Sequence, residues 1–313
     1  MPLIMIVSAW QRWLPDTWYS SQPGVGNPDF KPAAVPTPRA YAAGGRLSEY
    51  HYALAGGTSP VGDPLQVNEV YDFLSNTWAS RADMPTARRN LAGAPLPGRR
   101  LSAVGGNPSS TSTHLSTHEV YDHETNSWST KASLPSPRSN APAAPLADGR
   151  IMVPGGFNSS GVQTTTYIYD PQTNSWTQVA NWPVANFNHT ACLLSNDRVA
   201  ALGGRDVSFS IKGDHYHYDP QSNTWQARAA MPTPRMLLAS ALIANGLLMA
   251  VGGNSNTGSE TSRANEIYNP STNTWSARAL QPSVRQGAVG ASLPDGLGLV
   301  MGGQPSANEI YSY

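Results

Sequence analysis

The sequence is poor in lysine and cysteine and has no charge imbalance. Among its 313 residues Cys192 is the one cysteine, so no disulfide can form within the chain. Lysine occurs only at Lys31, Lys131 and Lys212, so arginine carries nearly all the positive charge. The 20 basic residues balance the 20 acidic ones. This composition argues against binding to nucleic acid or to a membrane surface through a basic face.

Long hydrophobic runs are also missing. No stretch reaches the ~20 apolar residues of a transmembrane helix, so no membrane partner is expected. Residues 1–9 are apolar but lack the basic start of a signal sequence. The low charge and the many Ser, Thr and Asn residues lean towards an extracytoplasmic location. No like-charged tail or unpaired apolar helix indicates an obligate partner, so the expected state is a monomer.

The chain instead repeats one pattern about every fifty residues. An apolar run ends in two glycines, a polar loop follows, and a Glu-x-Tyr-Asp-like segment leads to an Asn-x-Trp turn. The double glycines start at Gly56, Gly105, Gly155, Gly203, Gly252 and Gly302. The tryptophans are Trp78, Trp128, Trp176, Trp225 and Trp275. A period of this length, with about four short strands per unit, is typical of propeller blades.

These features, together with the Met-Pro-x-x-Arg segments at residues 84–88 and 231–235, resemble the Kelch repeat. The resemblance covers residues 27–313. It implies an all-β fold, a six-bladed β-propeller with four antiparallel strands per blade. It fixes no single function, since Kelch propellers serve as binding platforms, scaffolds and occasionally enzymes.

The two ends of the chain complement each other. Residues 309–313 match the third strand of a blade, and no fourth strand follows in the sequence. Residues 1–26 lie outside the repeat, and we expect an extension packed on the propeller of residues 27–313. An N-terminal strand, with Trp18 or Phe30 at the tryptophan position, is expected to complete the last blade and close the ring.

Two repeat positions are expected to form a charged pair. The link that enters each blade ends in Arg39, Arg88, Arg138, Asn186, Arg235 or Arg285. The third strand starts at Glu69, Glu119, Tyr167, Tyr216, Glu266 or Glu309. Blade 3 keeps Arg138 but has Tyr167 in place of glutamate, so Arg138 is predicted to be an unpaired anion anchor at the mouth. The alternative, a structural arginine that bonds loop carbonyls, stays open.

Blades 3 and 4 depart from the repeat at the predicted mouth. Blade 4 opens with an Asn-Phe-Asn-His segment where other copies have Arg followed by small or apolar residues. By resemblance to Kelch ligand-binding domains, link residues and residues after the double glycines contact a ligand. The predicted ligand-binding residues are Arg138, Arg205, Asn107, Phe157, Asn186, Phe187, Asn188, Tyr167, Asn254 and Gln304.

The leading functional hypothesis is a binding module at the loop face near blades 3 and 4. Its ligand is predicted to be polar or anionic: a carboxylate-bearing small molecule, a glycan or an acidic peptide. The alternative is a metal-free pocket enzyme at the same mouth, either a cyclase or an isomerase resembling the sugar mutarotases. The candidates for proton transfer in that case are His189, Tyr216 and Asp206.

No metal and no cofactor are expected. His215 and His217 point to one face of a strand, but two histidines without a third ligand are a weak metal signal. Galactose oxidase, a Kelch-like copper enzyme, crosslinks a cysteine to a tyrosine. Here Cys192 stands where other copies have Gly or Ala, which favours a small core residue.

Overall fold

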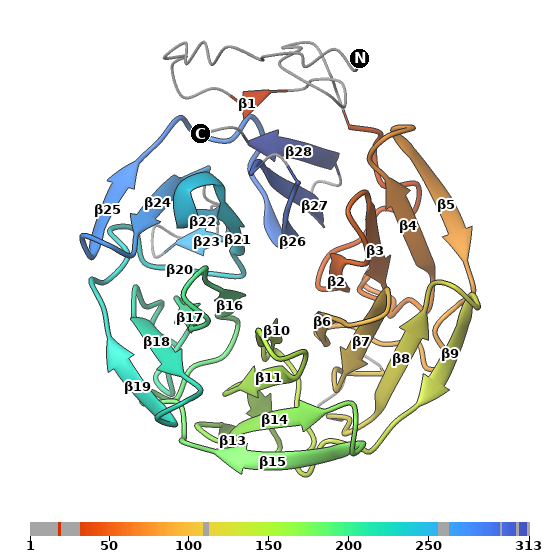
Figure 1. Cartoon of the computed structure of the whole chain (residues 1–313), viewed down its shortest axis with the longest axis horizontal. Coiled ribbons are helices and arrows are strands. Elements are labelled where there is room, and N and C mark those ends of the chain that lie inside the picture. The colour runs from red at the N-terminus through yellow and green to blue at the C-terminus, as the bar shows by residue number, and fades with distance from the viewer. Residues whose placement is uncertain are drawn as a thin grey trace, which may run out of the picture.

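The computed structural model describes residues 18–19, 32–108, 113–255, 263–294, 296–304 and 307–311. Five four-stranded antiparallel sheets follow one another within residues 43–277 and stand around a central axis as blades (Figure 1). In each blade the innermost strand comes first in the sequence and the outermost comes last. The predicted all-β propeller with four-stranded antiparallel blades is therefore confirmed.

The strands run from the axis to the rim in the following order. Blade 1 contains β2 (Ala43–Arg46), β3 (His51–Ala55), β4 (Asn68–Asp72) and β5 (Thr77–Arg81). Blade 2 contains β6 (Ala92–Leu96), β7 (Arg100–Val104), β8 (His118–Asp122) and β9 (Ser127–Thr130). Blade 3 contains β10 (Ala144–Pro145), β11 (Ile151–Pro154), β14 (Thr166–Asp170) and β15 (Ser175–Val179).

Blades 4 and 5 continue this order. Blade 4 contains β16 (Thr190–Leu193), β17 (Val199–Leu202), β18 (His215–Asp219) and β19 (Thr224–Ala227). Blade 5 contains β21 (Ala239–Ile243), β22 (Leu247–Val251), β24 (Asn265–Asn269) and β25 (Thr274–Ala277). Two small ladders pair β12 (Phe157–Asn158) with β13 (Gly161–Val162) and β20 (Arg235–Met236) with β23 (Asn254–Ser255).

A last sheet lies between blade 5 and blade 1 (Figure 1). It contains β26 (Gln286–Ser292), β27 (Gly298–Gln304), β28 (Ala307–Tyr311) and β1 (Trp18–Tyr19). In the β1–β28 pair, Trp18 lies opposite Tyr311 and Tyr19 opposite Ile310. A strand from the N-terminal part of the chain therefore takes the outer position in a sheet built from the C-terminal part. Apart from β1, the predicted extension of residues 1–26 lies outside the described residues.

Burial follows the position of a strand within its blade. All five residues of β22 are buried, whereas no residue of the outer strand β25 is. Because both faces of a blade pack against its neighbours, an inner strand is a continuous apolar run and does not alternate. In the described part of the chain the one helical segment is the three-residue turn η1 (Ala244–Gly246), and no helix there is long and apolar enough to cross a membrane.

Six residues around the axis form a closed cycle of backbone hydrogen bonds. Each lies two residues after the link position and has left-handed backbone, with φ between 54° and 66°. They are Tyr41, Asn90, Asn140, Asn188, Leu237 and Gly287. Each N–H donates to the carbonyl of the preceding member over 2.8 to 3.0 Å, and Tyr41 donates to Gly287. This axial cycle joins neighbouring blades at their inner edges.

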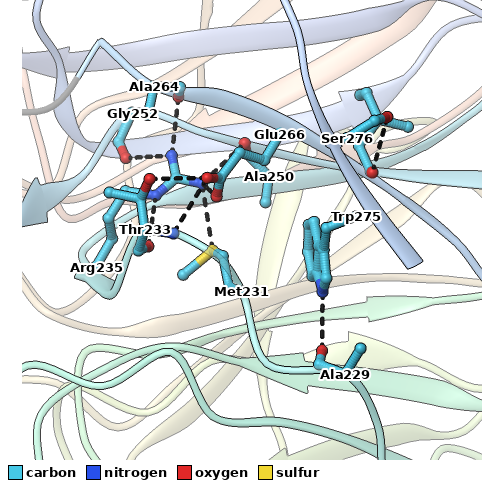
Figure 2. Close-up of polar contacts among 11 residues, drawn as sticks. Ala229, Met231, Thr233, Arg235, Ala250, Gly252, Ala264, Glu266, Trp275 and Ser276 are labelled. Atoms are coloured by element: carbon cyan, nitrogen blue, oxygen red, sulfur yellow. Dashed lines mark hydrogen bonds and ion pairs between the residues drawn. The ribbon is translucent and has the colours of Figure 1, made fainter. Parts of the chain in front are cut away.

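At the rim, a tryptophan and an asparagine of one blade hold an alanine of the preceding link. The Trp275 indole donates to the Ala229 carbonyl at 2.8 Å (Figure 2), and the Asn273 side-chain oxygen accepts the Ala229 N–H at 2.9 Å. The same oxygen accepts the Tyr268 hydroxyl at 2.8 Å. The other indole contacts are Trp78–Ala33, Trp128–Ala82, Trp176–Ala132 and Trp225–Ala180. This rim clamp explains the Asn-x-Trp turn of the repeat.

Candidate functional site

The link arginines bind inside their own blades. Arg235 donates to the Gly252 carbonyl at 3.0 Å and pairs with Glu266 at 2.7 Å, and both side chains are buried (Figure 2). The same pair occurs in blades 1 and 2 as Arg39–Glu69 and Arg88–Glu119, at 2.5 and 3.0 Å. The predicted Arg–Glu pairing is thus confirmed in these three blades. For Arg285, the side chain of the predicted partner Glu309 lies outside the described residues.

The Arg138 side chain also points into its own blade. It donates to the carbonyls of Gly155 (2.9 Å) and Thr165 (2.8 Å) and to the Thr165 hydroxyl (2.7 Å). The guanidinium lies 5.1 Å from the ring centre of Tyr167, and the residue is 2% exposed. No described carboxylate pairs with it, and Nη2, which contacts glutamate in blades 1, 2 and 5, donates here to the Thr165 hydroxyl. Arg138 and Tyr167 therefore contact each other inside blade 3, and their contact with a ligand stays a prediction.

Blade 4 has Asn186 in place of the link arginine, and a tryptophan stands where two other blades have methionine. Asn186 is buried and donates to the Gly203 carbonyl at 3.1 Å and to Asp214 at 3.3 Å. Four residues before the link position, blades 2 and 5 place Met84 and Met231, whose sulfur contacts the arginine. Blade 4 has the buried Trp182 at this position. The indole fills volume that the shorter asparagine leaves.

The three candidates for proton transfer have separate surroundings. His189 is buried and stacks on Trp182 at 5.3 Å between ring centres, and burial lowers its pKa to about 3. Tyr216 contacts the same indole edge-on, also at 5.3 Å. Asp206 lies on a surface loop and pairs with Lys212 at 2.8 Å, a hydrogen-bonded contact that lowers the Asp206 pKa. A neutral, buried His189 is suited to packing and not to proton transfer near neutral pH.

Residues that follow the double glycines lie at one end of the blades, as predicted. Each pairs in antiparallel fashion with the residue after the link position. The pairs are Ala40–Thr58, Arg89–Asn107, Ser139–Phe157, Phe187–Arg205, Met236–Asn254 and Gln286–Gln304. We call this end of the propeller the mouth. Blades 3 and 4 are the ones that place phenylalanine there.

A row of aromatic rings crosses the mouth from blade 2 to blade 4. The ring centres of Phe157 and Phe187 are 5.4 Å apart, and those of Phe187 and Phe209 are 5.9 Å apart. His114 continues the row at 5.5 Å from Phe157. We call His114, Phe157, Phe187 and Phe209 the aromatic row. Phe209 lies in the loop between β17 and β18 and is not among the ligand-binding residues predicted from the sequence.

Amide side chains line one half of the channel inside the mouth. A cavity of about 160 Å³ is bounded by the first strands of the blades and by Asn90, Asn140 and Asn188 of the axial cycle. Leu237, Gly287 and Tyr41 of that cycle lie on the other half. The axial cycle therefore contributes amide side chains to the channel wall over blades 2 to 4 and none on the other half.

Hydrogen bonds connect these amides to the aromatic row. Asn90 donates to the Asn107 side-chain oxygen at 3.3 Å. Asn140 donates to the Ser139 hydroxyl at 3.0 Å, and the same hydroxyl lies 2.9 Å from His114 Nδ1. Asn254, a predicted ligand-binding residue, donates to the side-chain oxygen of Gln286 at 3.5 Å, on the half of the ring away from these amides.

Arg205 supplies the available positive charge of blade 4 at the mouth. Its Nε donates to the Phe209 carbonyl at 3.1 Å, and its guanidinium carbon lies 5.1 Å from the centre of the Phe209 ring. The side chain is partly exposed. Nη1 and Nη2 form no hydrogen bond or ion pair with the described residues. Arg205 is therefore the predicted site residue whose charge remains free for an anion.

The remaining histidine candidates lie in the core, and Cys192 is partly buried against it. His215 and His217 are buried, and their Nε2 atoms are 3.1 Å apart. Burial raises the pKa of the Cys192 thiol to about 12. Across the residues that the structure describes, no group of three or more His, Cys, Asp or Glu side chains is arranged to hold a metal ion.

Comparisons with known proteins agree with this architecture. The family model for the Kelch motif matches residues 138–181 and 235–279. The solved structure titled "Structure of YjhT" superimposes with a TM-score of 0.74 at 15% sequence identity, over 89% of this chain and 95% of that chain. At this identity the likeness shows the fold alone. No curated protein matches the sequence.

Proposed function

We propose that this Kelch-repeat β-propeller is a binding module that holds an acidic peptide segment of a partner protein at the mouth of blades 3 and 4. The observation that carries the proposal is Arg205, whose Nη atoms are unbonded within the described residues beside the aromatic row. Arg205 replaces the predicted anchor Arg138, whose donors face its own blade. In the proposed complex, a carboxylate of the peptide binds Arg205, and an apolar side chain of the peptide packs on Phe187 or Phe209.

The shape of the mouth favours a peptide over a small molecule or a single sugar. The channel cavity of about 160 Å³ is smaller than the roughly 300–1,000 Å³ of pockets that enclose drug-sized ligands. The ligand must then lie across the mouth, where the Phe187 and Arg205 positions are adjacent. The alternative of a mutarotase-like isomerase needs a titrating group at this place, whereas His189 is neutral and buried.

A pair of labelled peptides tests the proposal. The probe is a fluorescein-labelled decapeptide of alternating Glu and Gly, and its control has Gln in place of Glu. We expect the acidic peptide to raise fluorescence anisotropy and the control to leave it unchanged. Arg205→Gln should weaken binding by about tenfold or more, because a hydrogen bond to a charged group contributes roughly 1.5–3 kcal/mol.

The matched variant is Arg198→Gln in the same blade. Arg198 precedes β17, at the opposite end of that strand from Arg205, and pairs with Asp219 at 2.9 Å. This variant removes the same charge and is expected to bind like the wild type. Equal loss in both variants would assign the effect to net charge, and binding of neither peptide would contradict the proposed function.

We also propose that the ring has six blades and that the N-terminal strand closes it. Three features support this: the β1–β28 pairing, the six-membered axial cycle, and the rim clamp at Ala33. Ala33 is held by Trp78 (2.9 Å) and Asn76 (2.7 Å) of blade 1, as alanines of the other links are held by later blades. Deleting residues 1–26 should lower Tm by several degrees, and an unchanged Tm would contradict the closure.

A further inference from the structure

Two hairpins at the mouth have the same backbone design. The blade 1 hairpin (residues 58–64) is closed by the Thr58–Pro64 bridge, and the blade 4 hairpin (residues 205–211) by the Arg205–Ile211 bridge. Both contain a backbone hydrogen bond from the second residue to the sixth, 2.8 Å in blade 1 and 3.1 Å in blade 4. Both contain another from the fifth residue to the second, at 3.0 Å. The two hairpins can therefore be compared position by position.

The comparison aligns Phe209 with Gly62. Gly62 has φ of 98°, in the region that glycine adopts without steric cost. Phe209 has φ of 59°, also left-handed, although a bulky side chain rarely takes this conformation. Such a residue persists when its surroundings hold it there, and it is often found at functional sites. Blade 4 thus has an aromatic ring where the same loop elsewhere uses glycine.

Phe209 is also exposed. Its side chain is 55% accessible, and Val207 in the same hairpin is 63% accessible. The Phe209 ring meets Phe187 edge-on and lies under the guanidinium of Arg205. Aromatic residues, phenylalanine among them, and arginine are enriched at protein interfaces.

Hydrogen bonds and an ion pair within the hairpin hold its backbone in place. The Asp206 carboxylate accepts the N–H groups of Ser208 (2.9 Å) and Ser210 (3.0 Å) and pairs with Lys212. Arg205 in turn donates to the Phe209 carbonyl. A loop fixed in this way pays little conformational entropy on binding. Asp206, which the sequence analysis considered for proton transfer, has the role of holding this loop.

We propose that Phe209 is the aromatic anchor of the mouth, and that the recognised segment has an aromatic side chain next to its acidic residue. This inference rests on the proposed function. The acidic group binds Arg205 while the neighbouring ring packs on Phe209, which lies within reach because Arg205 and Phe209 are in contact. The recognised segment is therefore an acidic residue next to an aromatic residue, which is more specific than an acidic peptide of any sequence.

Three labelled decapeptides and one variant test the inference. The first peptide alternates Glu and Gly, the second has one central Gly replaced by Trp, and the third is the Trp peptide with Gln for Glu. We expect the Trp peptide to bind about tenfold more tightly than the first, a typical gain for an aromatic anchor. Phe209→Gly should abolish that gain, so that the variant binds the Trp peptide no more tightly than the Glu–Gly peptide.

Stability separates an anchor from a packing residue. Because the blade 1 hairpin has Gly62 at this position, Phe209→Gly should leave Tm unchanged or raise it. The matched control is Val61→Ser, which removes an 84% exposed side chain from the blade 1 hairpin and should change neither Tm nor binding. A fall in Tm of several degrees for Phe209→Gly would make the ring structural and overturn the inference.

The peptide outcomes separate the two proposals. Equal affinity for both Glu peptides, with Phe209→Gly binding like the wild type, overturns the anchor and leaves the acidic-peptide function in place. Binding of the Gln–Trp peptide as tightly as the Glu–Trp peptide overturns the role of the acidic group. If none of the three peptides binds, both proposals are wrong.

Discussion

Acidification should destabilise this fold through four histidines that are buried in the neutral form. His118, His189, His215 and His217 are each at most 6% exposed. Burial lowers their pKa values to about 4 for His118 and His215 and to about 3 for His189 and His217. In the unfolded chain each imidazole titrates near pH ~6.5. As the pH falls below that value, protons bind the unfolded state and not the folded one, so stability is lost.

The size of the effect follows from this difference in proton uptake. Between pH 7.5 and 5.5, each buried histidine should cost about 1.4 kcal/mol of unfolding free energy. At pH 5.5 all four remain neutral in the folded state, so the contributions add to about 5 kcal/mol. This is a large part of the roughly 5–15 kcal/mol that stabilises a typical domain.

The repeat itself supplies the variant for the assay. His217 occupies the position of Ile168 in blade 3 and Ile267 in blade 5. Urea unfolding followed by tryptophan fluorescence at both pH values gives the acid-induced loss for the wild type and for His217→Ile. The variant should lose about 1.4 kcal/mol less than the wild type, whatever its stability at pH 7.5. An identical loss would refute the claim that His217 is held neutral by burial.

Further variants test the buried polar contacts. Arg235→Ala should lower the unfolding free energy by about 3–5 kcal/mol, because Glu266 is left buried without its partner; an unchanged urea midpoint would contradict this. Arg138→Ala should lower stability by about 1–3 kcal/mol but keep the acidic-peptide affinity within about twofold, and lost affinity at full stability would return Arg138 to the site. Trp275→Phe should cost about 1 kcal/mol through its bond to Ala229, and an unchanged Tm would exclude that role.

The repeat pattern predicted the parts of the molecule that every blade needs. Equal spacing of glycines and tryptophans indicated the propeller, and comparison of copies identified Arg–Glu pairs such as Arg235–Glu266. Such pairs are visible in a sequence because both partners are side chains. A comparison of the copies also reveals that two changes occur together in blade 4. Trp182 stands at the methionine position, and Asn186 stands at the arginine position.

The bonding partners of Arg138 and the position of Phe209 at the mouth could not be predicted from a comparison of the repeats. Arg138 lacks a glutamate, and its Nη2 donates to the Thr165 hydroxyl instead, while its Nη1 donates to two carbonyls as Arg235 does. Thr165 stands two residues before the glutamate position, so a comparison of that position alone does not reveal it. Phe209 lies in a loop with no repeat register of its own. Its alignment with Gly62 follows from the bridges and hydrogen bonds of the two hairpins, which only the folded chain reveals.

If blades 3 and 4 form a binding site at the mouth, an added ligand must contact the residues by which they depart from the repeat. Backbone and arginine side-chain NMR spectra recorded while the Glu–Trp peptide is added measure this contact residue by residue. We expect shifts concentrated at Phe187, Arg205 and Phe209, with Arg198 at the other end of blade 4 unchanged. Shifts confined to the Arg198 end, or spread evenly over all blades, would contradict it.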